Sequence, residues 1–521
     1  MKTASIFTSH MIFQRGKDIH IWGVGEENEK VSVTLQYSES GQPVVIPSSC
    51  SVQTAVQDGC WHIILPPLDV CRNVVCIICG ESETITLEDI SIGDVYLAGG
   101  QSNMEFWMRY DADLAAERNI CANQDIRFYD CPEICYEGQE QDFDYSKMGF
   151  WRTCDPENIE YFSAVGYYFA KEIQRSQQIP VGIIGCNWGG STASAWMDEE
   201  HLSKHGQIWL DEYQEGLKNI PEDYVENFRK NPMNDRGNPF ENAFGETMLF
   251  GLSHEEQLKF MKENPSDDSI NLIGPCHQNR PGGLYEFMLK KTAPFPVSGV
   301  LWYQGESDET HAAIYKDVLS DMIDCWRELW HDTLPFFCVQ LAPFDVWLEC
   351  TGDNFPVIRQ QQYDLSREKE GVFLISSSDG GMRYDIHPKK KQPIGYRLAL
   401  CARSYIYGED ISWDAPVMDS VVLKDRTLLL HFAHAYEGLS MQGSLQALQI
   451  FGITPEGKRT EIPADSCQYM AGGEQITVIL PDAVLFAELE IAFAYTPYYE
   501  VNLYNSAGIP AIPSRIVMKT M

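Results

Sequence analysis

The α/β character of this chain is decided by the stretch Val95-Tyr-Leu-Ala-Gly-Gly-Gln-Ser-Asn-Met-Glu105. Its first four residues are apolar and typical of a buried strand, and the glycines that follow permit a sharp turn. Ser102 then stands exposed where we expect a helix to begin. Because active sites in open α/β sheets form in loops that follow strands, this stretch predicts both a fold class and a site.

Outward from this stretch, strand-like and helix-like segments alternate along the chain. Strands are predicted at residues 181–186, 300–303, 336–341 and 372–375, and helices at residues 163–174, 312–330, 356–368 and 392–407. Such alternation indicates right-handed crossovers and a parallel sheet with helices on both faces. We therefore expect an α/β catalytic domain over residues 92–410.

The two ends of the chain show a different pattern, in which apolar and polar residues alternate with period two. This pattern predicts short strands, so we expect an all-β, sandwich-like module over residues 1–91 and a second β module over residues 411–521. Residues 198–279 are polar, acidic and rich in Asn and Pro without strong periodicity. We interpret them as an insertion at the rim of the sheet, as a lid or a substrate wall.

The length and charge of the chain indicate its number of domains and exclude some classes of partner. The chain has 521 residues, enough for about three domains. Its 75 acidic and 39 basic side chains give a net charge of −36, which argues against nucleic acid and anionic membranes as partners. No uncharged apolar run is long enough to span a membrane, and the first residues do not resemble a signal peptide.

The cysteine content of the chain indicates the redox state of its cellular compartment. Many of the 16 cysteines lie in apolar runs, as buried free thiols do, which favours a reducing compartment and a cytoplasmic location. A secreted or periplasmic protein whose leader has been removed is the alternative. Cys76 and Cys79 form a C-x-x-C pattern, but residues three apart on a strand point to opposite faces. We therefore expect no metal site at this pair of cysteines.

Two loops carry candidate groups for acyl transfer. In the first, Ser102 could be a nucleophile whose own N–H faces a developing oxyanion, although a serine near glycines is commonly a helix N-cap. In the second, Gly189 and Gly190 follow the strand at residues 181–186 and could offer a backbone N–H to an oxyanion. A plain tight turn explains this second loop equally well.

Two further loops supply side chains of matching chemistry. Gln304 and Glu306 follow the strand at residues 300–303 and offer an amide donor and a carboxylate, although a helix cap would also account for the glutamate. His387 lies between a strand and the last helix with Asp385 beside it. A histidine is the natural base for a serine, and a carboxylate can hold its tautomer. His311 is the second choice for this base.

One apparent phosphate-binding pattern is set aside. Residues 452–458 match most of a P-loop, but Arg459 replaces the Ser or Thr that would hold magnesium. The Pro-Glu-Gly sequence within this segment, between two strand-like runs, predicts a hairpin instead.

Taken together, the four loops resemble the sialate O-acetylesterase family of SGNH (GDSL-like) carbohydrate acetylesterases. The resemblance rests on Gly100-Gln-Ser-Asn-Met, Trp188-Gly-Gly-Ser-Thr, Trp302-Tyr-Gln-Gly-Glu-Ser and Asp385-Ile-His-Pro, with weaker similarity at both ends of the chain. It implies an SGNH-type three-layer α/β/α core, a serine nucleophile at Ser102 and a base at His387. It also implies an oxyanion hole made of the Ser102 N–H, an N–H of the glycine pair, for which we favour Gly190, and Gln304.

The chain departs from the wider superfamily at the acid. That group commonly stands three residues before the histidine, which here is Tyr384, so Asp385 or a backbone carbonyl is expected to orient His387. The candidates for substrate binding are Asn103, Gly189, Glu306, Arg280 and Arg383, and Arg109 is a further possible partner for a substrate carboxylate.

The resemblance implies hydrolysis of O-acetyl groups on a carbohydrate, with O-acetylated sialic acid as the favoured substrate. This chemistry is expected to require no metal and no cofactor. Acetylated xylan or another polysaccharide is the rival substrate, and a noncatalytic carbohydrate-binding protein is the rival class. The expected partner is a small acetylated sugar or a glycan, with neither nucleic acid nor membrane, and the sequence does not predict an oligomeric state.

Overall fold

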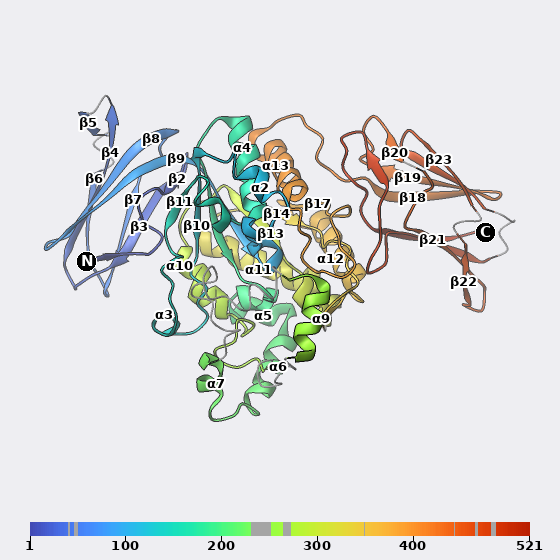
Figure 1. Cartoon of the computed structure of the whole chain (residues 1–521), viewed down its shortest axis with the longest axis horizontal. Helices are drawn as coiled ribbons and strands as arrows, with labels where there is room; N and C mark the ends of the chain where they lie inside the picture. Colours follow the sequence, from blue (N-terminus) through green and yellow to red (C-terminus); the bar gives the residue numbers. More distant parts are fainter. Residues whose placement is uncertain are drawn as a thin grey trace. The chain divides into compact units, whose positions relative to one another are not determined.

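The structure is a computed structural model that describes residues 1–39, 42–45, 51–230, 252–263, 272–348, 350–441, 443–463, 467–480 and 486–520. Its helices and strands are drawn in Figure 1. The chain divides into two compact units. Unit 1 comprises residues 1–307 and 317–336, and unit 2 comprises residues 308–316 and 337–521. The predicted domain boundaries at 91 and 410 remain predictions. Among the described helices, none is both long and apolar enough to cross a membrane.

Unit 1 begins with antiparallel strands, as the period-two pattern predicts. One sheet joins β1 (Lys2–Thr3), β3 (Ile19–Val24) and β7 (Cys60–Leu65). In a second group, β4 (Lys30–Glu39) pairs with β5 (Gln42–Val45), β6 (Ser51–Ala55) and β8 (Cys71–Cys79). In β8 the thiol of Cys76 is buried while Cys79 is partly exposed, which confirms that the two cysteines point to opposite faces.

The strand β9 (Thr84–Gly100) connects this β-rich region to the core of unit 1. Its first half is antiparallel to β8, whereas its second half is parallel to β12 (Val181–Asn187) and β13 (Gly299–Tyr303). The short strand β2 (Ile12–Gln14) pairs with the middle of β9. Residue 91 therefore lies inside one continuous strand.

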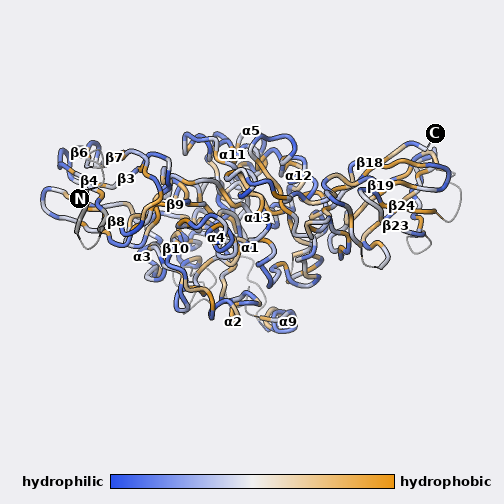
Figure 2. The backbone as a smooth tube through the Cα atoms, turned by 90° about the horizontal axis from the view of Figure 1, so that it is seen from above, coloured by the Kyte–Doolittle hydropathy of each residue, from blue (hydrophilic) through white to orange (hydrophobic). Residues whose placement is uncertain are grey.

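The parallel strands of unit 1 are buried along their length. β10 (Asn123–Asp130) is parallel to β12, and β11 (Trp151–Cys154) adds an antiparallel edge, so the sheet is mixed. The residues of β12 and β13 are buried throughout, as strands covered on both faces require. Hydrophobic segments such as β9 appear orange in Figure 2, whereas the outer helix α9 (His254–Glu263) is mostly blue.

Helices that the sequence predicts pack on this sheet. α4 (Ala164–Gln177) contacts β12 and β10, and the side chain of Ser163 caps its first turn by accepting the N–H of Gly166. α11 (Tyr315–Trp330) places Trp326 against Trp302, with ring centroids 5.6 Å apart.

The predicted insertion differs from the expectation of an aperiodic segment. Its described part forms α5 (Glu199–His205), α6 (Gln207–Leu217), α7 (Tyr224–Lys230) and α9, while residues 231–251 and 264–271 lie outside the described residues. These helices are short and bury few side chains each, so their apolar periodicity is weak in the sequence.

Unit 2 contains the end of the predicted α/β series and the second β module. The strands β14 (Phe336–Val339) and β17 (Val372–Ile375) are neighbours, and α12 (Phe355–Glu368) and α13 (Gln392–Tyr407) pack on β17. Arg359 of α12 is fully buried, and its guanidinium donates to the carbonyl oxygens of Leu341, Ala342, Thr496 and Pro497. This arginine ties α12 to two loops of the unit.

The C-terminal β module is a sandwich of two antiparallel sheets. The first contains β18 (Val417–Lys424), β19 (Thr427–Ala433), β24 (Gln475–Ile479) and β23 (Gln468–Gly472), and the second contains β22 (Arg459–Ile462), β21 (Leu448–Ile453), β25 (Glu488–Phe493) and β27 (Ser514–Lys519). Buried side chains of both sheets share one core. Residues 454–458 connect β21 to β22, which confirms the hairpin.

Candidate active site

Ser102 lies at the carboxyl end of β9, as predicted, but its surroundings differ from the expectation. It is the first residue of the short helix α1 (Ser102–Glu105), and the N-cap is Gln101, which makes no side-chain capping bond. The interpretation of Ser102 as an N-cap is therefore wrong. Ser102 is also buried rather than exposed, with 6% of its surface accessible, because loops from neighbouring strands cover it.

The turn before Ser102 depends on Gly100. Its φ of +133° lies in a region that favours glycine, and a Cβ at this position would be 2.2 Å from the carbonyl oxygen of Tyr303. The same carbonyl oxygen accepts the N–H of Gln101 at 3.1 Å. The close approach of β9 and β13 thus fixes the backbone on which Ser102 stands.

The glycine pair follows β12 and lies beside Ser102. A Cβ on Gly189 would be 3.3 Å from the Ser102 Cβ, so the two loops are in contact. The N–H of Gly189 already donates to the Glu105 carboxylate. Gly190 has a φ of +72°, and the N–H of Ser191 bonds to the carbonyl of Trp188, so this loop is also the tight turn of the alternative interpretation.

The loop after β13 brings Gln304 and Glu306 to the same end of the sheet. Gln304 is fully buried, and its Nε2 donates to the carbonyl oxygen of Ser191 at 3.1 Å. The Asn103 amide donates to the Glu306 carboxylate at 2.6 Å. The structure therefore brings Ser102, Asn103, Gly189, Gln304 and Glu306 together within unit 1.

His387 lies in unit 2, on the segment between β17 and α13 where the sequence places it. Only 2% of its surface is accessible, and the Trp347 ring lies edge-on to it with centroids 5.0 Å apart. One carboxylate oxygen of Asp385 accepts the backbone N–H of His387 at 2.8 Å and lies 3.5 Å from the ring Nδ1. The second distance is longer than an ordinary hydrogen bond.

Charge and burial act on both members of this pair. Burial lowers the pKa of His387 to about 4, although the neighbouring Asp385 carboxylate opposes the shift. Burial alone would raise the pKa of Asp385, but the contacts with His387 and with Lys389, at 3.0 Å, outweigh it and lower that pKa. His387 is therefore neutral at pH 7, the form in which an imidazole can accept a proton.

The chain that carries this geometry is similar to known carbohydrate esterases. Residues 271–399 match a family model described as carbohydrate esterase, sialic acid-specific acetylesterase, and this segment contains Gln304, Glu306, Asp385 and His387. Over this segment the chain is similar to that family of carbohydrate esterases. This match and the relatives described next show a carboxylic ester hydrolase, so the noncatalytic interpretation is not supported.

Whole-length relatives agree with this assignment. The esterase is 25% identical to human sialate O-acetylesterase, over 98% of this chain and 91% of the relative, and 24% identical to the mouse enzyme, over 98% and 93%. Among solved structures, a carbohydrate acetylesterase from Xanthomonas citri has a TM-score of 0.72 at 24% identity, and the match covers 100% of both chains. This last likeness shows a shared fold.

Two of the arginines predicted to bind substrate have acidic neighbours of their own within the esterase. Arg280 donates to the carbonyl oxygen of Cys135 at 3.3 Å and lies 3.7 Å from Glu286, and Arg383 lies 3.1 Å from Asp345. Arg109 stacks over the ring of Tyr110. A role for any of these guanidinium groups in substrate binding remains a prediction.

Glu105 is a site residue that the sequence interpretation missed. Its carboxylate is 2% exposed and holds the N–H of Gly189 next to Ser102. This bond occupies the N–H of Gly189, and the assignment of Gly190 as the oxyanion donor remains a prediction. A glutamate three residues after a candidate nucleophile on one helical turn is the signal that could have identified it.

Among the described residues, one group of side chains has the types that bind metals. Asp198, His201 and Cys325 offer ligand atoms that all lie within 4.8 Å of one another. Asp198 accepts the backbone N–H of His201 at 2.8 Å and its ring Nδ1 at 2.9 Å, and the Cys325 thiol donates to the same carboxylate at 3.4 Å. This hydrogen-bond network connects α5 to α11. The predicted independence from metals and cofactors remains a prediction.

Proposed function

We propose that this esterase removes O-acetyl groups from sialic acid through an acetyl-serine intermediate. The curated relatives are named for sialate, and the family description specifies sialic acid, which together favour this sugar over xylan. We further propose an SGNH-type core with α/β/α layers, supported by the parallel strands β10, β12, β9 and β13.

In the proposed first step, Ser102 Oγ attacks the acetyl carbonyl while His387 accepts the hydroxyl proton. The N–H groups of Ser102 and Gly190 and the Gln304 amide stabilise the oxyanion. The tetrahedral intermediate then collapses, and His387 protonates the departing sugar oxygen. In the second step, His387 accepts a proton from water as the water attacks the acetyl-serine, and collapse returns Ser102 and releases acetate.

The observation that carries this proposal is the convergence of loops around Ser102. The loops at the carboxyl ends of β9, β12 and β13 contact one another: a Cβ on Gly189 would lie 3.3 Å from the Ser102 Cβ, and Gln304 donates to the carbonyl oxygen of Ser191. Such convergence supports an acyl-transfer site. His387 is neutral at pH 7, so its imidazole is in the form that can accept the serine proton. The participation of Asp385 in orienting this base is part of the proposal.

The test is acetate release from O-acetylated sialic acid. We expect Ser102→Ala to abolish release, whereas the control Ser176→Ala, on the outer part of α4, leaves it unchanged. Gln304→Ala should lower kcat by about a hundredfold, the usual effect of losing one oxyanion donor. Near-normal turnover by Ser102→Ala, with intact circular dichroism, would overturn the proposal.

The choice of sugar has a separate test. Acetylated sialic acid carries a carboxylate and acetylated xylose does not. We therefore expect one of Arg109→Gln, Arg280→Gln and Arg383→Gln to lower kcat/KM for the sialate only, whereas equal effects on both sugars would remove arginine recognition from the proposal. We also propose a cytoplasmic location, which the free, mostly buried cysteines of the described residues support.

A further inference from the structure

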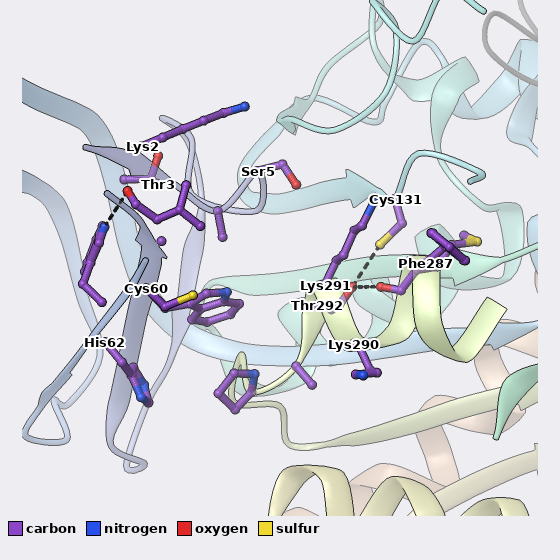
Figure 3. A pocket seen from close by; sticks show the side chains of 18 of the residues that line it. Lys2, Thr3, Ser5, Cys60, His62, Cys131, Phe287, Lys290, Lys291 and Thr292 are labelled. Atoms are coloured by element: carbon purple, nitrogen blue, oxygen red, sulfur yellow. Dashed lines mark hydrogen bonds between the residues drawn. The ribbon is translucent and has the colours of Figure 1, made fainter. Parts of the chain in front are cut away.

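Unit 1 contains a cavity of about 1000 Å³ that the proposed chemistry does not use (Figure 3). One wall is formed by the antiparallel strands β1, β3 and β7. The other is formed by residues after β10 and by the helical turns η8 (Tyr285–Leu289) and α10 (Lys290–Thr292). The volume is at the upper end of the range for small-ligand pockets, enough for an oligosaccharide.

The charge of this cavity is opposite to that of the chain. Acidic residues outnumber Lys and Arg by 75 to 39 overall, yet three lysines line this cavity, Lys2, Lys290 and Lys291, against two acids, Asp58 and Glu140. Lys2 comes from the strand wall and Lys291 from the helical wall (Figure 3). Among the described residues, no carboxylate lies within 4 Å of any of these three ammonium groups. An anion entering the cavity would therefore meet positive charge from both walls.

The cavity also offers partly exposed aromatic rings. Trp22 and Phe287 are half-buried, and the Lys291 ammonium lies 5.8 Å from the centre of the Phe287 ring. Rings of this kind pack against the C–H faces of sugars, while ammonium groups bind carboxylates. The turn that carries Phe287 is π-helical, a rare conformation that is frequent at functional sites.

From these observations we infer that this cavity is a noncatalytic binding site for a carboxylated glycan. The lysines bind the carboxylate, and Trp22 and Phe287 bind the sugar ring. The choice of a carboxylated sugar over other anions rests on the proposed function. Such a site would also offset the repulsion that a chain of charge −36 exerts on an acidic glycan.

The test measures calorimetric binding of 3′-sialyllactose, which has no O-acetyl group to hydrolyse, and of lactose as its neutral counterpart. We expect Lys290→Gln/Lys291→Gln to weaken sialyllactose binding by about tenfold or more, as the loss of charged hydrogen bonds does. The control Lys259→Gln/Lys262→Gln, which removes the same charge from α9, should bind as the wild type does. All three proteins should hydrolyse 4-nitrophenyl acetate equally.

Three results would overturn the inference: equal sialyllactose affinity in the wild type and the pocket variant, equally tight binding of lactose, or displacement by inorganic phosphate at matching concentration. The last would indicate a general anion site. These outcomes are distinct from failure of the proposed function, which is judged by acetate release in Ser102→Ala.

Discussion

The depressed pKa of His387 predicts an unusual pH profile for the esterase. The base must be neutral to accept the serine proton, so kcat/KM should fall on the acid side through the pKa of the free enzyme. That pKa is about 4 because the imidazole is buried, against an ordinary value of 6.5. At pH 5.5 about 97% of His387 would be neutral, against about 9% for an ordinary histidine, a difference of roughly tenfold in rate.

The assay is hydrolysis of 4-nitrophenyl acetate between pH 3.5 and 8, because this neutral ester does not titrate itself. Circular dichroism at each pH shows whether the protein stays folded. An acid limb centred near pH 6.5 in folded protein would refute the reasoning, because it would mean that His387 is solvated or is not the base.

The same shift predicts how stability depends on pH. The unfolded chain binds a proton at His387 below pH 6.5, whereas the folded chain binds one only below about pH 4. The free energy of unfolding should therefore fall by about 3 kcal/mol as the pH drops from 6.5 to 4. His387→Gln removes this proton, so its thermal midpoint should fall less over the same window. An identical fall in both proteins would contradict the burial argument.

Three further predictions concern residues that shape the two units. Glu105→Ala should lower kcat by roughly ten- to a hundredfold with little change in KM, because the N–H of Gly189 loses its acceptor. Glu105→Gln keeps an acceptor oxygen and should therefore recover part of the lost kcat. Arg359→Met should cost about 3 kcal/mol or more in thermal unfolding, because two buried and two partly buried carbonyls lose a charged donor, and Arg359→Lys should remain destabilised. Gly100→Ala should not yield folded protein, since its Cβ meets backbone, whereas Gly408→Ala, in open space, should cost only about 1 kcal/mol.

The elements that the sequence predicts well are those with strong local signals. The helix α13 begins at Gln392 and ends at Tyr407, as predicted, because proline stands in its first turn and Gly408 ends it with a φ of +69°. β17 also has its predicted bounds, because its sequence is a short run of apolar residues. In both cases, neighbouring residues in the chain carry the information.

What the sequence did not predict depends on contacts between distant segments. The burial of Ser102 arises from loops that follow β12 and β13, so no property of its own stretch reveals it. The bond from Gly189 to Glu105 likewise joins residues 84 positions apart. The helices α5 to α7 were missed because their buried faces are narrow.

The continuity of β9 limits how this architecture can change. The strand begins in the antiparallel β-rich region, ends two residues before Ser102, and contains residue 91 in its interior. Recombination at that position would divide a paired strand and leave each part with an unmatched edge. We therefore expect the N-terminal region to be inherited together with the nucleophile, and gene rearrangements that exchange whole modules to spare this junction.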